Sequence, residues 1–311
     1  MKDNESVRSP GIATGLVTDI RSGSLSRRAF LTRLAILAGG SAVVMACGTQ
    51  ATAIGPSRTP ASTDRPTSTA TAAASASEET MIESGPVEFE ADGRTLLGYL
   101  SRPASSGPHP GVLLVHENRG LLPHFLDVTR RLAGEGYVTL AVDMLSRKGG
   151  TDSFADTSAM LSALRGIPTD QIVEDGNAGV RYLQDQPYVD GSRVGAMGFC
   201  FGGGIVWRMA VGNPDLRAAA PFYGGAPPLE DVPNLRVPVL GIYAGADARI
   251  NAGVSGLESA LKAEGKIYRF VSYPGANHAF FNDTGSRYHP QAAGKAWLET
   301  LDWFEEHLMD S

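Results

Sequence analysis

The stretch Arg193-Val194-Gly195-Ala196-Met197-Gly198-Phe199-Cys200-Phe201-Gly202-Gly203 joins a strand-like run to a helical one. Its first five residues have the apolar, β-rich pattern of a buried strand, and a helical pattern begins at Gly203. Between the two, the glycines at 198 and 202 flank Cys200 with the G-x-nucleophile-x-G spacing of a nucleophile elbow. Such glycines let backbone segments approach more closely than any Cβ would allow. The spacing therefore predicts a strained turn that presents the Cys200 thiol.

The helix that follows this turn has a predicted electrostatic effect on the thiol. Its amide dipoles point toward Cys200, which favours a thiolate and leaves backbone N–H groups free to hold an oxyanion. Two other interpretations compete. A dinucleotide-binding loop does not fit, because Gly195, Gly198 and Gly202 do not have the G-x-G-x-x-G spacing. The other alternative is a glycine-rich turn between strand and helix with no chemical role.

Strand and helix patterns alternate on both sides of this turn. An Asp-Gly turn at 92–93 predicts a hairpin of residues 87–90 and 95–100, and residues 111–116 form an apolar run suited to a strand buried on both faces. Further strands are predicted at residues 137–142, 193–197, 217–222, 237–244 and 266–273. Helices are predicted at residues 123–134, 153–164, 169–184 (capped by Thr169), 203–211, 253–263 and 291–308. This order predicts one α/β domain over residues 85–311, with a mostly parallel sheet and helices on both faces.

A cysteine nucleophile needs a base, and the base needs a residue that orients it. His278 is the first histidine after the last predicted strand, and Asp247 directly follows the apolar strand before it. The chain order of nucleophile, acid and histidine is the one found in α/β-hydrolases. Other acids fit less well, since two of them are predicted in surface loops and one precedes the nucleophile; they are Asp215, Asp231 and Asp143. The prediction is a triad of Cys200, Asp247 and His278.

Four segments together resemble the dienelactone hydrolase family of α/β-hydrolases. They are Gly198 to Gly203, His116-Glu117-Asn118, Gly245-Ala246-Asp247 and Asn277-His278-Ala279-Phe280. The resemblance covers nearly all of residues 85–311. It implies the α/β-hydrolase fold, a Cys-Asp-His triad, hydrolysis of a lactone such as a carboxymethylenebutenolide, and no metal or organic cofactor.

The resemblance also implies roles for residues around the triad. Glu117 would contact the resting thiol, and the backbone N–H groups of Asn118 and Phe201 would form the oxyanion hole. A buried carboxylate at a strand end is costly unless it is paired, which also favours a functional place for Glu117. Members of the family grip the substrate carboxylate with arginines, one of them just beyond the histidine, where this chain has Asn282. The candidate replacements, each of which could equally be a surface arginine, are Arg119, Arg249 and Arg287.

The first 84 residues have the composition of an export signal and a tether. Arg27 and Arg28 precede a short apolar run at residues 34–46, as in a twin-arginine signal, and Val44-Met45-Ala46-Cys47 resembles a lipoprotein cleavage box. Residues 1–47 are therefore predicted to be a signal whose Cys47 becomes lipidated, although a simple cleavage is the alternative. Residues 48–84, rich in Ala, Ser, Thr and Pro, are predicted to be a flexible linker.

The net charge and the cysteine content limit the classes of partner that the protein can have. The net charge of −6 offers no basic face for nucleic acid. If Cys47 carries lipid, Cys200 is left as an unpaired thiol in an oxidising compartment, which favours a functional thiol over an inert buried one. The expected partners are a small ester or lactone substrate and a membrane reached only through the lipid anchor. The alternative functions are a general carboxylesterase or thioesterase, and an exported ligand-binding lipoprotein on a hydrolase scaffold that has lost activity.

Overall fold

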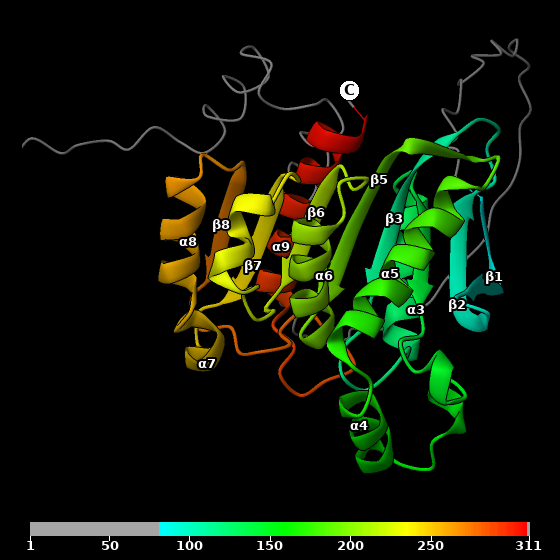
Figure 1. The fold of residues 1–311 in the computed structure, drawn as a ribbon, viewed down its shortest axis with the longest axis horizontal. Coiled ribbons are helices and arrows are strands. Elements are labelled where there is room, and N and C mark those ends of the chain that lie inside the picture. The colour runs from blue at the N-terminus through cyan, green and yellow to red at the C-terminus, as the bar shows by residue number, and fades with distance from the viewer. Residues whose placement is uncertain (1–80, 310–311) are drawn as a thin grey trace, which may run out of the picture. The chain divides into compact units, whose positions relative to one another are not determined.

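The computed structural model describes residues 81–309, which form an eight-stranded sheet flanked by helices (Figure 1). The predicted signal, Cys47 and most of the predicted linker lie outside the described residues. The strands are β1 (Ile82–Ala91), β2 (Arg94–Pro103), β3 (His109–Val115), β4 (Val138–Val142), β5 (Val189–Phe199), β6 (Ala218–Phe222), β7 (Val239–Ala244) and β8 (Tyr268–Tyr273). Strand β1 begins ahead of the predicted domain start at Gly85, because residues 82–84 pair with residues 101–103 of β2.

The sheet has the order β1-β2-β4-β3-β5-β6-β7-β8. Strands β1 and β2 are antiparallel to each other, β2 is antiparallel to β4, and every other pair is parallel. The predicted hairpin is present, and both Asp92 and Gly93 have positive φ values, of 50° and 67°, as a two-residue hairpin turn requires. The predicted α/β-hydrolase fold with a mostly parallel sheet is confirmed.

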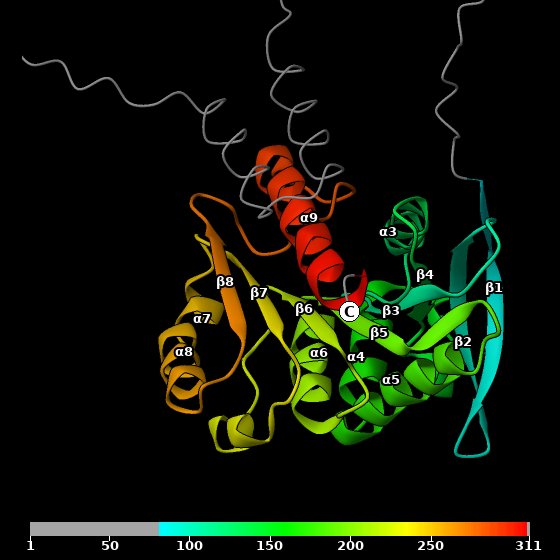
Figure 2. The same ribbon diagram turned by 90° about the horizontal axis from the view of Figure 1, so that it is seen from above.

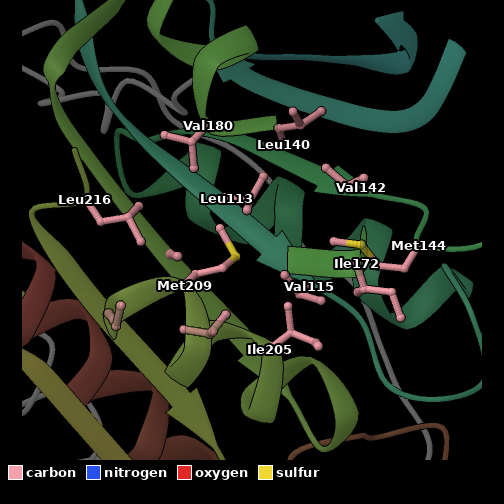
Figure 3. Close-up of a cluster of buried hydrophobic side chains, with 14 of the residues drawn as sticks. Leu113, Val115, Leu140, Val142, Met144, Ile172, Val180, Ile205, Met209 and Leu216 are labelled. Carbon is pink, nitrogen blue, oxygen red and sulfur yellow. The ribbon is translucent and has the colours of Figure 1, made fainter. Parts of the chain in front are cut away.

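Helices cover both faces of the sheet (Figure 2). Their bounds are α3 (Pro123–Gly134), α4 (Thr157–Arg165), α5 (Thr169–Gln184), α6 (Phe201–Gly212), α7 (Ala248–Asn251), α8 (Val254–Ala263) and α9 (Pro290–Phe304), with short 3₁₀ turns at residues 146–148, 151–153 and 229–234 and a π turn at 305–309. Helices α3 and α9 pack on one face with one apolar cluster, and α5, α6 and α8 on the other. Figure 3 shows how Met209 of α6 and Val180 of α5 approach Leu113 of β3 in the second cluster.

The cap of α5 and the start of α4 differ from the sequence prediction. Helix α5 has its predicted bounds, but its N-cap is Pro168 rather than Thr169. Pro168 is the last residue with extended dihedrals, so Thr169 is already helical and cannot act as the cap. Helix α4 begins at Thr157, later than the predicted residue 153, because the Asp156 side chain accepts a hydrogen bond of 2.9 Å from the N–H of Ala159 and caps the helix there.

The carboxyl ends of the parallel strands gather the predicted site residues at one edge of the sheet. Glu117 lies just after β3, Cys200 directly after β5, Asp247 after β7 and His278 after β8. Figure 1 shows α4 and α7 beyond the lower edge of the sheet, near the orange loop that leads to α9. Among residues 81–309, no helix has both the length and the apolar character that crossing a membrane would require.

Candidate active site

Cys200 lies at the apex of the turn between β5 and α6. Its φ of 56° and ψ of −111° are strained values for a residue with a side chain, as expected for a nucleophile elbow. Close contacts between backbone segments require glycine at positions 198 and 202. A Cβ on Gly202 would lie 2.2 Å from the carbonyl oxygen of Val115, and one on Gly198 would lie 2.4 Å from the carbonyl oxygen of Gly202. The elbow therefore packs directly against the end of β3.

The structure brings the three predicted triad residues together. His278 Nε2 lies 2.9 Å from Cys200 Sγ, and His278 Nδ1 lies 2.5 Å from Asp247 Oδ2. Asp247 is the N-cap of α7 and is 8% exposed, and its Oδ1 accepts a hydrogen bond from the N–H of Ile250. The Nδ1–H of His278 donates to the carboxylate, so Nε2 is free to accept the thiol proton. This arrangement can pass a proton from the sulfur to the imidazole while the carboxylate orients the ring.

The competing histidines and acids lie elsewhere. His289 caps α9 through an Nδ1 that accepts from the N–H of Ala292, and the ring of His307 packs on Trp303. Asp215 is exposed, and Asp231 lies in the 3₁₀ turn at 229–234. Asp143 is buried, but its carboxylate accepts hydrogen bonds from Thr151 and from the N–H of Leu145, so it fixes the loop after β4.

The resting state of the thiol differs from the sequence prediction of a favoured thiolate. Burial and the negative charge of Glu117 raise the pKa of Cys200 to about 11, against the opposing effects of the Phe201 N–H, Arg249 and the Asn118 N–H. The backbone N–H groups lower the pKa of Cys200, in the predicted direction, but burial and Glu117 raise it by more. Burial and Glu117 therefore favour the thiol form of Cys200, whose Sγ lies 2.9 Å from His278 Nε2.

The two predicted oxyanion donors both approach the sulfur. The backbone N–H groups of Phe201 and Asn118 form hydrogen bonds toward Cys200 that lower its pKa. The loop carrying Asn118 is fixed by His116, whose Nδ1 lies 2.6 Å from the carbonyl oxygen of Glu117 and whose Nε2 accepts from the N–H of Met144 at 3.0 Å. Two preorganised N–H groups beside the sulfur can stabilise the negative oxygen of a tetrahedral intermediate.

Glu117 is 7% exposed, and its hydrogen bonds go to residues other than Cys200. The hydroxyl of Tyr223 donates to Oε1 at 3.3 Å, and Nδ2 of Asn282 donates to Oε2 at 3.2 Å. The Tyr223 ring also packs edge-on against the His278 ring, with centroids 5.1 Å apart. The sequence prediction named neither of these partners as a site residue. Their only sequence signal was position: Tyr223 directly follows β6 and Asn282 lies four residues after His278.

A cleft of about 370 Å³ opens over Cys200. Of the three predicted arginines, Arg249 lines it, whereas Arg119 and Arg287 are exposed and lie outside the lining. The sequence prediction missed the wall formed by α4, which contributes Leu161, Leu164 and Arg165. The other lining residues are Asn118, Cys200, Phe201, Gly204, Tyr223, Gly225 and Ile250. Within residues 81–309, no cluster of three or more His, Cys, Asp or Glu side chains is arranged to hold a metal ion.

Comparison with known proteins identifies the family of the chain. A sequence model of the dienelactone hydrolase family matches residues 96–308. A relative from Methylorubrum extorquens named "Putative carboxymethylenebutenolidase" is 33% identical, over 72% of this chain and 81% of its own length. A relative of the same name from Salmonella typhimurium is 35% identical, over 73% of this chain and 88% of its own length.

Solved structures show the same likeness. The crystal structure of a "Putative Dienelactone Hydrolase" from Klebsiella pneumoniae matches with a TM-score of 0.69 and 31% identity, over 73% of this chain and all of that chain. A dienelactone hydrolase-like promiscuous phosphotriesterase from metagenomic libraries matches with a TM-score of 0.65 and 26% identity, over 73% of this chain and 98% of that chain. The chain belongs to the dienelactone hydrolase family and is a hydrolase of the ester or lactone type on an α/β-hydrolase scaffold.

Proposed function

We propose that this hydrolase cleaves a carboxymethylenebutenolide-like lactone or a related ester, with Cys200 as nucleophile, His278 as base and Asp247 as the orienting acid. The observation that carries the proposal is the continuous contact from Sγ through the imidazole to the carboxylate, over 2.9 Å and 2.5 Å. The names of the relatives support the substrate class.

In the proposed mechanism, the raised pKa of Cys200 makes proton transfer part of the attack. His278 Nε2 takes the thiol proton as the sulfur bonds to the carbonyl carbon, and the N–H groups of Phe201 and Asn118 hold the oxyanion. The imidazolium then returns the proton to the departing oxygen, the C–O bond breaks, and an acyl-thioester remains. A water deprotonated by His278 attacks this thioester and releases the acid, and the thiol regains its proton.

The cleft supports a substrate with an anionic group and an apolar body. Arg249 contributes an electrostatic effect at the Cys200 sulfur, and Arg165 enters the same cleft from α4. The guanidinium group suits carboxylate recognition because its donors match the two oxygens. Leu161 and Leu164 supply an apolar wall beside them. A lactone or ester that carries a free carboxylate fits this combination.

The test is a panel of esters, lactones and thioesters assayed with the purified protein and with Cys200→Ala. The expected result is hydrolysis of p-nitrophenyl acetate and, faster, of a carboxylated dienelactone, with both lost in Cys200→Ala. Cys200→Ser should retain part of the activity because the elbow geometry survives. Wild-type rates in Cys200→Ala would refute the proposed nucleophile.

The same panel decides between the alternative functions. A general carboxylesterase or thioesterase would prefer neutral esters or thioesters over the carboxylated lactone. A ligand-binding lipoprotein would react with iodoacetamide at Cys200 without having any turnover to lose. The paired contacts of His278 with Cys200 and Asp247 favour an enzyme over a binding protein, because binding alone requires no such arrangement.

We further propose export by the twin-arginine route and a lipid anchor at Cys47. The support is the sequence alone: the adjacent Arg27 and Arg28, the short apolar run after them and the cleavage box before Cys47. Metabolic labelling with a fatty acid should mark the wild-type protein and not Cys47→Ala. Replacement of both arginines by lysine should retain the protein in the cytoplasm; equal export of that variant would contradict the route.

A further inference from the structure

His116 directly follows β3 and is completely buried. Its Nε2 accepts a hydrogen bond of 3.0 Å from the N–H of Met144, so this nitrogen carries no proton. Its Nδ1 lies 2.6 Å from the carbonyl oxygen of Glu117, which can only accept, so the ring proton is on Nδ1. The two contacts agree on one tautomer, in which His116 is a neutral donor to the Glu117 carbonyl.

The Glu117 carbonyl and the Asn118 N–H belong to the same peptide group. Because this group is planar, its C=O and N–H bonds point in opposite directions. A donor that fixes the oxygen therefore also fixes the direction of the Asn118 N–H, which points toward the Cys200 sulfur. A hydrogen bond to the oxygen also polarises the amide and makes its N–H a stronger donor.

We propose that His116 is a positioning residue for the oxyanion hole: through the Glu117 carbonyl, it aims the Asn118 N–H at the developing negative oxygen and strengthens that donor. The inference rests on the proposed function, because the oxyanion forms only when Cys200 attacks a carbonyl group. The ring has no exposed surface, so it acts on the transition state without touching the substrate.

The groups around the ring do not replace this contact. The N–H of Gly120 also donates to the Glu117 oxygen, but at the longer distance of 3.3 Å. Asp143 Oδ1 lies 3.8 Å from His116 Nε2, beyond hydrogen-bond distance, and the Asp143 carboxylate accepts from groups of its own loop. His116 therefore connects the oxyanion turn to the loop after β4, through the N–H of Met144.

Two substitutions separate the two contacts of the ring. His116→Gln places an amide oxygen near the position of Nε2, so it keeps the contact with Met144 and loses the donor to Glu117. His116→Asn places an amide nitrogen near the position of Nδ1, so it keeps the donor to Glu117 and loses the acceptor for Met144. Each variant loses one buried hydrogen bond, so thermal unfolding followed by circular dichroism should show similar decreases in Tm.

Steady-state kinetics with p-nitrophenyl acetate should distinguish the two variants. We expect kcat to fall by about tenfold or more in His116→Gln and by less than about threefold in His116→Asn. KM should change little in both, because the donor acts on the oxyanion of the transition state. His109→Gln is the matched control: it makes the same change in a partly exposed histidine at the other end of β3 and should leave kcat unchanged.

Alkylation of Cys200 separates an effect on the oxyanion from general damage to the site. Iodoacetamide is attacked at a tetrahedral carbon, where the C–S bond forms as iodide leaves and no oxyanion arises. In His116→Gln the alkylation rate should therefore change by less than about threefold while kcat falls. Mass spectrometry of the Cys200 peptide from the full chain measures this rate separately from that of Cys47.

A measurement on the wild-type chain decides the question if His116→Gln does not fold. Acetaldehyde adds to Cys200 as a thiohemiacetal: the C–S bond forms, the thiol hydrogen moves to the carbonyl oxygen, and that oxygen occupies the oxyanion hole. The Nδ1–H proton of His116 should then move downfield in ¹⁵N-edited NMR, because a new acceptor at the Asn118 N–H strengthens the connected hydrogen bonds. The signal of ¹³C-labelled acetaldehyde shows that the adduct is present.

Three results would overturn the inference. They are equal losses of kcat in His116→Gln and His116→Asn, an alkylation rate that falls in parallel with kcat in His116→Gln, and an Nδ1–H proton of His116 that does not move in the acetaldehyde adduct. Ester hydrolysis by Cys200→Ala tests the proposed function separately. If Cys200→Ala is inactive and His116→Gln has a wild-type kcat, the nucleophile stands and the role of His116 falls.

Discussion

The two sides of the cleft are built from different parts of the fold. The proposed reacting groups come from strand ends: Cys200 follows β5 directly, and Asp247, which is 8% exposed, follows β7. The facing wall comes from the short helices α4 and α7 beyond the sheet edge, and its arginines, Arg165 and Arg249, are exposed. The proposed chemistry therefore depends on the packed strand ends that carry Cys200 and Asp247. We call these strand ends the frame, and we expect it to tolerate little change. We expect substrate choice to depend on these exposed side chains, which can change without disturbing that frame.

Loss of the nucleophile or the base should have the largest effect. Cys200→Ala and His278→Ala should each lower kcat/KM for p-nitrophenyl acetate by about 10⁴-fold, because neither group can form the acyl-thioester alone. The double variant should be no worse than either single one, which steady-state kinetics on all three proteins would show. Multiplicative losses would mean that the two residues act independently, contrary to the 2.9 Å contact between them.

The orienting acid should matter less than the groups it serves. Asp247→Asn keeps the shape of the side chain but removes the charge that fixes the Nδ1–H tautomer of His278, so kcat should fall by about 10²- to 10⁴-fold with little change in KM. Circular dichroism should show an intact fold. A wild-type kcat in Asp247→Asn would mean that another residue orients His278.

The arginines should affect selectivity more than chemistry. Arg249→Ala and Arg165→Ala should each raise KM for a carboxylated ester by about tenfold, the scale of one hydrogen bond to a charged group. The KM for a neutral ester of the same length should change less than about twofold. Arg287→Ala is the matched control, because that exposed arginine lies outside the cleft lining. Equal effects on charged and neutral esters would remove the arginines from substrate recognition.

The apolar part of the helical wall should give the smallest effect. Leu161→Ala removes part of a partly exposed wall, so kcat/KM for long-chain esters should fall by about threefold while that for acetate esters stays unchanged. Comparing acetate with butyrate and hexanoate esters measures this. A loss that is independent of chain length would show that α4 supports the frame rather than the substrate.

The frame could be predicted from sequence because its signals are local. The Gly-x-Cys-x-Gly turn identifies Cys200, and strand order places Asp247 and His278 at the same sheet edge. The cleft wall could not be predicted in this way. Arg165 and Leu161 lie in a helix after β4 whose pattern says nothing about the direction in which it folds over the edge. The hydrogen bond of Asn282 to Glu117 joins residues 165 positions apart, and the thiol state of Cys200 depends on burial that no local pattern reports.

The most direct test of the central claim is detection of the acyl group on Cys200. Rapid acid quenching during turnover of p-nitrophenyl acetate, followed by peptide mass spectrometry, should show acetylation of the Cys200 peptide as a hydroxylamine-sensitive thioester. Cys200→Ala treated in the same way should show none. Turnover by the wild type under conditions that trap a control thioester, with Cys200 unmodified or with the acyl group on another residue, would contradict the account.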